Sequence, residues 1–156
     1  MRLACVLPVM LAGCAPLADP RSPPTSDEHL IALLFEDARS IENQLARDFA
    51  CVSLRYGVAD RDPPPGVIDA LRSRWKVPVV AGSRCSIGEA STVAAPGVTG
   101  TGKWLRITNF QCPDADHCTA DVSYYVANLG AGGRSVAIER TRSGWRITPT
   151  GAMWIS

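Results

Sequence analysis

Residues 112–118, CPDADHC, place two cysteines, a histidine and two aspartates within seven positions. Such side chains bind metals, but structural zinc sites usually have cysteines two to four residues apart and a second pair elsewhere, which the sequence does not show. Redox sites use the spacing C-x-x-C, whereas five residues separate Cys112 from Cys118. We therefore interpret the segment as a hairpin turn closed by a disulfide, with Asp114 and Asp116 solvated, and we predict no metal and no cofactor.

Residues 97–104, GVTGTGKW, come close to the phosphate-binding pattern G-x-x-x-x-G-K-[ST]. Trp104 stands where that pattern needs a hydroxyl group to hold magnesium. The residues that follow alternate in the manner of a strand, whereas a phosphate loop must open a helix. The near match therefore does not predict a nucleotide site.

The residues that could do acid–base or nucleophilic chemistry are few and scattered. His29 and His117 are the only histidines, and they lie near opposite ends of the chain, so the sequence assembles no Ser-His-Asp or Cys-His set. Glu89, Asp121 and Glu139 could in principle form a carboxylate pair. We interpret all three as solvated side chains in loops or on outward strand faces, and we predict no catalytic residue.

The N-terminus has the pattern of an export signal. An apolar run of about eleven residues follows Arg2; a membrane span needs about 20, whereas this length suits a secretory signal. The run ends in four residues that resemble the lipobox of bacterial lipoproteins, namely Leu11, Ala12, Gly13 and Cys14. The resemblance implies that Cys14 receives lipid and that residues 1–13 are removed. In such lipoproteins an aspartate after the lipid-bearing cysteine commonly marks retention in the inner membrane. Because residue 15 is alanine, the resemblance also implies the periplasmic face of the outer membrane.

Composition divides the remaining chain into a tether and one domain. Residues 14–26 contain four prolines and little apolar bulk, which predicts an extended tether after the lipid-bearing cysteine. Residues 27–156, about 130 residues, have the size of a single domain. Removal of the signal takes away Arg2 and leaves basic residues equal in number to the 15 acidic ones. This balance of charges does not favour binding to nucleic acid, which needs a basic face, or binding to a membrane surface through a polybasic patch. The expected partners are the membrane, through the lipid, and an envelope protein.

Four cysteines remain in the mature chain: Cys51, Cys85, Cys112 and Cys118. In an oxidising compartment an even set usually pairs, and four cysteines allow three connectivities. We favour Cys51 with Cys85 and Cys112 with Cys118, because the second pair flanks a short turn.

Two helices are predicted at the start of the domain. Thr25 and Glu28 have the spacing of a capping box, and a helix is expected from there to about Ala50, with Cys51 at its end. Its apolar stripe is Leu30, Leu34, Ala38, Ile41, Leu45 and Phe49. A shorter helix is expected after the prolines of residues 60–66, with an apolar face of Val67, Ile68, Leu71 and Trp75.

The last third of the chain predicts an antiparallel meander of four strands, at residues 104–112, 118–127, 134–141 and 144–148. A brief strand is expected at 77–80, and residues 82–102 are expected to be irregular. In the second strand of the meander Ala120, Val122, Tyr124 and Val126 share one face. We expect Tyr124 opposite Ile138 and Val126 opposite Val136. The whole pattern predicts an α+β fold with helices on one face of a curved antiparallel sheet of about four strands.

Residues 65–156 resemble small exported bacterial proteins with a nuclear-transport-factor-2-like (NTF2-like) or cystatin-like roll. The features that carry this resemblance are the helix ending at Trp75, the run VPVVAGSRC at 77–85, the meander, and the endings GWRI and MWIS. Proteins with such rolls serve as binding modules, enzymes or structural parts, so the fold alone determines no function.

Aromatic residues gather in the C-terminal third: Trp104, Phe110, Tyr124, Tyr125, Trp145 and Trp154. They are either core or cross-strand pairs, or they line a pocket between sheet and helix. We expect a non-enzymatic binding or structural lipoprotein of the cell envelope. The alternative is a small periplasmic enzyme or small-ligand binder with a pocket in the concave side of the sheet.

Overall fold

The computed structural model describes residues 27–41, 47–127 and 130–156. The expected signal peptide, Cys14, the tether and the capping residue Thr25 lie outside these ranges, as does Leu45. The described residues include no helix that is long and apolar enough to cross a membrane.

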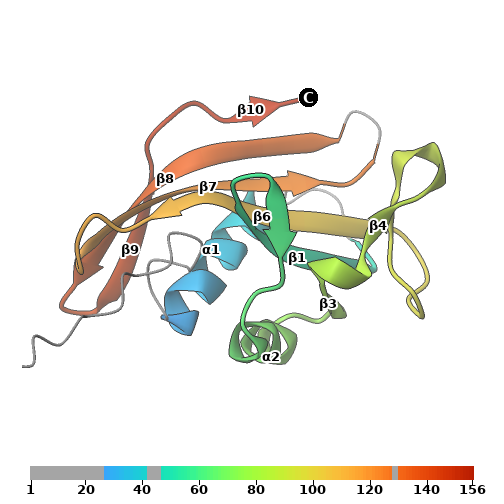
Figure 1. Cartoon of the computed structure of the whole chain (residues 1–156), viewed down its shortest axis with the longest axis horizontal. Helices are drawn as coiled ribbons and strands as arrows, with labels where there is room; N and C mark the ends of the chain where they lie inside the picture. The colour runs from blue at the N-terminus through green and yellow to red at the C-terminus, as the bar shows by residue number, and fades with distance from the viewer. Residues whose placement is uncertain (1–26, 42–46, 128–129) are drawn as a thin grey trace, which may run out of the picture.

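The described residues form two helices and a large mixed sheet of eight strands (Figure 1). The strand order is β10-β8-β7-β6-β1-β2, with β3 also paired to β1 and β9 also paired to β8. The α+β prediction is confirmed, but the sheet has twice the expected number of strands and is not purely antiparallel, because β1 runs parallel to β3 and β6. The strands are β1 (Phe49–Tyr56), β2 (Ala59–Arg61), β3 (Val79–Ala81), β6 (Gly102–Gln111), β7 (His117–Tyr125), β8 (Ala131–Thr141), β9 (Gly144–Pro149) and β10 (Trp154–Ile155).

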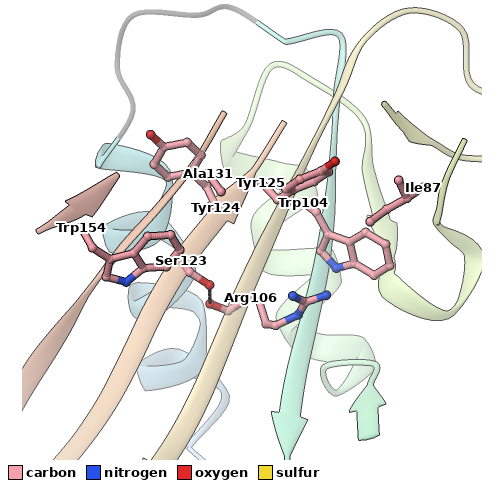
Figure 2. Close-up of a pocket in the computed structure, with 8 residues that line it drawn as sticks. All are labelled: Ile87, Trp104, Arg106, Ser123, Tyr124, Tyr125, Ala131 and Trp154. Carbon is pink, nitrogen blue, oxygen red and sulfur yellow. Dashed lines mark hydrogen bonds between the residues drawn. The ribbon is translucent and has the colours of Figure 1, made fainter. Parts of the chain in front are cut away.

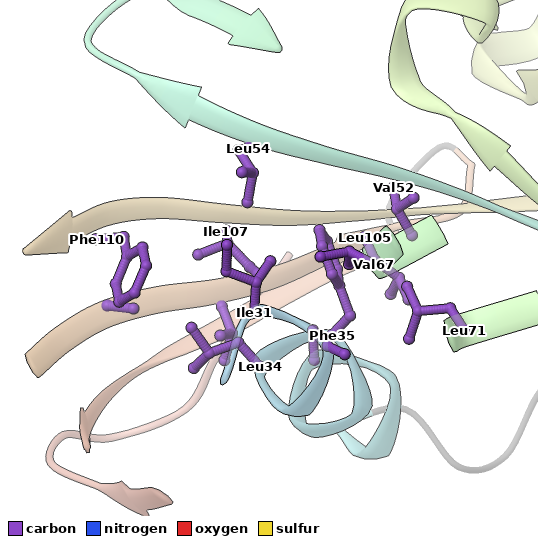
Figure 3. Close-up of a cluster of buried hydrophobic side chains, with 14 of the residues drawn as sticks. Ile31, Leu34, Phe35, Val52, Leu54, Val67, Leu71, Leu105, Ile107 and Phe110 are labelled. Carbon is purple, nitrogen blue, oxygen red and sulfur yellow. The ribbon is translucent and has the colours of Figure 1, made fainter. Parts of the chain in front are cut away.

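Both helices lie on the same side of the sheet (Figure 1). Helix α1 (Glu28–Ser40) covers β6 and β7, and α2 (Pro65–Arg74) packs beside it. Figure 3 shows the resulting core, in which side chains of α1 meet those of the central strands. The largest fully buried side chains of this core are Leu30, Ile31, Leu34, Phe35, Val52, Val67, Leu71, Leu105, Ile107, Val122 and Ile138.

The predicted length of the first helix is wrong. Helix α1 begins after Asp27, whose carboxylate accepts the backbone N–H of Leu30 at 3.1 Å, and it ends at Ser40 rather than near Ala50. Phe49 and Ala50 open β1 instead, so Cys51 lies in a central strand and not at a helix end. The reason is that β1 is buried on both faces over most of its length. Such a strand shows a continuous apolar run, which periodicity cannot tell from a helix.

The second helix and the brief strand after it are confirmed. Helix α2 has Pro65 in its first turn and ends where Trp75 adopts an extended conformation. The Trp75 indole N–H donates to Glu36 of α1 at 2.7 Å and so joins the two helices. The segment expected to be irregular contains short elements: η1 (Gly82–Arg84), β4 (Ser86–Ile87), η2 (Glu89–Ser91) and β5 (Val93–Ala94). Strands β4 and β5 pair with each other, outside the main sheet.

The four meander strands are confirmed as β6, β7, β8 and β9, but the register between β7 and β8 is wrong. Tyr124 lies opposite Gly132 rather than Ile138, and Val136 lies opposite Ala120 rather than Val126. The turn is tighter than expected. The Val126 N–H donates to the Gly130 carbonyl at 2.8 Å, and β8 already begins at Ala131.

The predicted inward face of β7 is correct in spite of that register. Ala120, Val122, Tyr124 and Val126 are all buried. A slip by an even number of residues leaves each side chain on the same face of a strand, because side chains alternate with period two. Burial could therefore be predicted while the pairing was not.

Candidate ligand-binding groove

The sheet face that points away from the helices carries a mixed aromatic and polar surface. Leu105 and Ile107 of β6 point into the helix-side core, so Trp104 and Arg106 point to the opposite side. Opposite them on β7 lie Tyr125 and Ser123. This face therefore gathers Trp104 and Arg106 of β6 with Ser123 and Tyr125, which alternate with the buried residues of β7.

A groove of about 160 Å³ crosses this face. Figure 2 shows the indole of Trp154 on one side of it and Trp104 with Ile87 on the other, with Arg106 and Ser123 between them. The side chains come from β4, β6, β7, β8 and β10. The lining residues are Ile87, Trp104, Arg106, Ser123, Tyr124, Tyr125, Ala131 and Trp154.

Trp154 is positioned by a glycine in β8. Trp154 pairs with Gly133, and a Cβ atom at Gly133 would lie 2.9 Å from Cζ2 of the indole. The absence of that atom lets the ring approach the backbone of β8 closely. Trp154 as a whole is still 50% exposed. The short strand β10 therefore presents half of a tryptophan to solvent at the edge of the groove.

The other aromatic groups of the groove use their polar atoms inside the protein. The Trp104 indole N–H donates to Ser53 Oγ at 2.9 Å, and the Tyr125 hydroxyl donates to the Ser91 carbonyl at 2.6 Å. The Arg106 guanidinium lies 5.2 Å from the centroid of the Trp104 ring, within cation–π range. These bonds fix the orientation of the rings and leave their apolar faces for packing.

Arg106 belongs to a cluster of two cations and one carboxylate. Asp60 of β2 accepts two hydrogen bonds from Arg55, at 2.8 and 2.9 Å, and one from Arg106 Nη2, at 3.1 Å. Arg106 Nε is buried and has no hydrogen-bond partner among the described residues. Burial lowers the pKa of Arg106, the negative charge of Asp60 opposes that effect, and the positive charge of Arg55 adds to it.

Replacing Asp60 by asparagine is expected to lower the free energy of unfolding by about 1 kcal/mol at pH 7, a modest value because the side chain is 26% exposed. Burial by itself would raise the pKa of Asp60, but hydrogen bonds and charge from Arg55 and Arg106 outweigh it, and the pKa lies below its ordinary value of 3.8. The carboxylate therefore stabilises the fold above about pH 4, and this stabilisation is lost as the pH falls through the lowered pKa.

Urea denaturation of wild type and Asp60→Asn as a function of pH measures this difference. Asp69→Asn, which alters an exposed carboxylate paired with Arg72, is the control and should stay within about 0.5 kcal/mol of wild type. A difference between wild type and Asp60→Asn that stays constant from pH 7 to pH 2 would contradict the ionic role of Asp60.

The disulfide between Cys51 and Cys85 ties one wall of the groove to the sheet. It joins β1 to the segment that leads into β4, where Ile87 lies. A second, smaller core lies under this segment on the face away from the helices. Its buried members are Phe49, Cys51, Val80, Val93 and Ala95.

The segment CPDADHC forms the expected turn between β6 and β7, closed by a disulfide between Cys112 and Cys118. Asp114 accepts the backbone N–H groups of Asp116 and His117, each at 2.8 Å, and lies 2.9 Å from His117 Nδ1. These backbone and side-chain hydrogen bonds hold the pKa of Asp114 below its usual value. Among the described residues no group of three potential ligands is arranged to hold a metal.

The structure does not bring the proposed acid–base residues together. Glu89 is exposed, and Glu139 pairs with Arg146. Asp121 accepts hydrogen bonds from Asn109 and Ser135, at 2.6 and 2.5 Å. His29 is exposed in the first turn of α1.

The predicted aromatic group divides between the two faces of the sheet. Phe110 is buried in the helix-side core, and the Trp145 indole N–H donates to Asp27 at 2.7 Å. Tyr124 borders the groove but belongs to the helix-side core, whereas Trp104, Tyr125 and Trp154 line the groove on the face away from the helices and not between sheet and helix. Sequence reasoning missed Arg106, Ser123 and Ile87. The alternation of β7 placed Ser123 on the face opposite the buried residues but gave no sign that it lines a groove, and no face was predicted for Arg106.

A second hollow of about 460 Å³ lies beside the turn that joins β1 and β2, and it is more open than the groove. Tyr56 lines it, and its hydroxyl is buried with no hydrogen-bond partner among the described residues. Burial raises the pKa of Tyr56 to about 12, so this phenol stays neutral at physiological pH.

Comparison with protein-family models gives no match, and searches of curated proteins and of solved structures give none either.

Proposed function

We propose that this chain is a cell-envelope lipoprotein, anchored through lipid on Cys14 to the periplasmic face of the outer membrane, whose domain is a non-enzymatic binding module. The observation that carries the binding role is the groove between Trp104 and Trp154. Half-exposed tryptophan beside an incompletely paired arginine is typical of surfaces that bind a partner or ligand. Two disulfides support an oxidising, exported location.

The chemistry of the groove favours binding over catalysis. Among the described residues that line it, none is a histidine, cysteine, lysine or carboxylate, and the charged side chain is Arg106. Arginine stays protonated in proteins, so it supplies a fixed charge and not a proton relay. The Ser123 hydroxyl donates to the Arg106 carbonyl, at 3.4 Å, and it has no hydrogen bond to a histidine or carboxylate within the described part of the chain. Such a site can hold and orient a molecule.

For the finer fold class we propose an NTF2-like or cystatin-like roll. The short helix α2, the strand β3 that follows it and the meander from β6 to β9 support this proposal, since they lie in the order that the resemblance implies. In such a roll the helices pack on one side of a curved sheet, and the other side is free to carry a site.

The anchor is tested by metabolic labelling of the full chain with a fatty-acid analogue. Wild type is expected to incorporate the label, and Cys14→Ala is expected to lose all of it, because the thiol of Cys14 is the proposed acceptor. Cys5→Ala is the matched control, since Cys5 lies in the same apolar segment but outside the lipobox pattern, and its labelling should equal that of wild type. Equal labelling of wild type and Cys14→Ala would remove the lipoprotein proposal.

A further inference from the structure

We propose that the groove binds a small organic anion that carries one ring-shaped body and a carboxylate. This inference rests on the proposed binding role and names the class of ligand. The carboxylate would face Arg106, and the ring would pack against Trp104 and Trp154. Charge, unused hydrogen-bond donors and size each point to this class.

The charges around Arg106 leave a positive surplus. Arg55 and Arg106 share the single carboxylate of Asp60, and Arg55 takes it with two hydrogen bonds against one for Arg106. Asp60 does not line the groove, so no carboxylate of the lining residues opposes an incoming anion. A ligand carboxylate would supply the counter-charge that this cluster lacks.

Arg106 also has unused hydrogen-bonding capacity. A guanidinium has five N–H donors, and this one makes a single hydrogen bond, to Asp60, among the described residues. Its Nε is buried without a partner, so the protein does not saturate it. Nε itself is not exposed, so an acceptor in the groove would approach the exposed part of the side chain, which is 25% exposed as a whole and lines the groove.

The aromatic walls define the rest of the ligand. Trp154 presents half of its surface, and Trp104 is held in place by its bond to Ser53. Two tryptophans could also receive an ammonium group through cation–π contacts. Arg106 would repel such a cation, so its charge decides in favour of an anion. A volume of about 160 Å³ is below the roughly 300 Å³ at which drug-sized pockets begin, so it suits one ring with short substituents.

Equilibrium dialysis of the full chain, purified in detergent, tests the inference with radiolabelled benzoate and glucuronate. These probes represent the two sources of this chemistry, an aromatic acid and an acidic sugar. Benzyl alcohol and methyl glucoside are their neutral counterparts. We expect at least one acid to bind at least tenfold more tightly than its neutral counterpart, and we expect its affinity to fall as salt is added. The acid that binds identifies the source.

Two variants distinguish direct contact between the ligand and Arg106 from the effect of the cluster's overall positive charge. Arg106→Gln is expected to weaken binding of the acid at least tenfold. Arg55→Gln removes the same charge from the same Asp60 cluster but no side chain that lines the groove, so we expect a clearly smaller loss than in Arg106→Gln, due to the charge alone. Near-ultraviolet circular dichroism checks that both variants fold. The comparison of acid with neutral probe uses wild type alone, so it remains decisive if a variant does not fold.

Equal affinity for acid and neutral probe would overturn the ligand class while leaving a binding groove. Equal losses in the two arginine variants would overturn the contact with Arg106. Absence of saturable binding by either acid would overturn this inference, and the labelling of Cys14 would still decide the anchor separately.

Discussion

Replacing Cys51 and Cys85 together by alanine is expected to lower the free energy of unfolding by about 4 kcal/mol. The bridge joins residues 34 positions apart, and the entropy that a cross-link removes from the unfolded chain grows with the length of the closed loop. Cys51 is fully buried in β1, so the change also removes sulfur atoms from the smaller core. Urea denaturation of both proteins under non-reducing conditions measures the difference.

The pair Cys112 and Cys118 is the internal control for this prediction. It closes a separation of only 6 residues, so the corresponding double alanine variant should lose about 2 kcal/mol. The two variants should also differ in function. Loss of Cys51–Cys85 frees the segment that carries Ile87 and should weaken ligand binding, whereas loss of the turn disulfide should leave the groove intact. Equal losses of stability would contradict the loop-length argument.

Replacing Phe35 by alanine is expected to destabilise the protein by about 3 to 5 kcal/mol. Phe35 is fully buried on the face of α1 that packs against the sheet, and Figure 3 shows it pointing toward Leu105 of β6. Truncation removes its transfer free energy and leaves a cavity that the rigid sheet cannot fill. Urea denaturation is the measurement.

Val58→Ala is the matched control, because Val58 is 100% exposed in the turn between β1 and β2. We expect that variant to remain within about 0.5 kcal/mol of wild type. A loss below 1 kcal/mol in Phe35→Ala would show that α1 is not an integral part of the core. The groove lies on the other face of the sheet from Phe35. Under conditions where Phe35→Ala remains folded, the ligand affinity of this variant should therefore match that of wild type.

Local patterns predicted the parts of the fold whose signals are local. Strands β6 to β9 were found because each alternates between a buried and an exposed face, which a few neighbouring residues reveal. Helix α2 was found from its prolines and the apolar residues that follow. The two disulfide pairs were favoured from spacing and context, and both are present in the structure.

Strand β1 and the register of β7 with β8 could not be derived in this way. One face of β1 is buried in the helix-side core, which contains Ala50 and Val52, and the other in the smaller core, which contains Phe49 and Cys51. This two-sided burial removes the alternation that would mark a strand. For β7 and β8, several registers related by even slips place apolar residues together. The turn around Gly130 selects one of them.

The sequence by itself determined which residues of β7 face inward, and it predicted export with a lipid on Cys14. Only the tertiary structure decided where the aromatic residues gather. Trp104, Ser123 and Trp154 lie far apart in the chain and meet because β6, β7, β8 and β10 are neighbours in the sheet. Strand neighbourhood is set by non-local packing of the whole core, so a groove built across strands becomes visible only when the sheet is assembled.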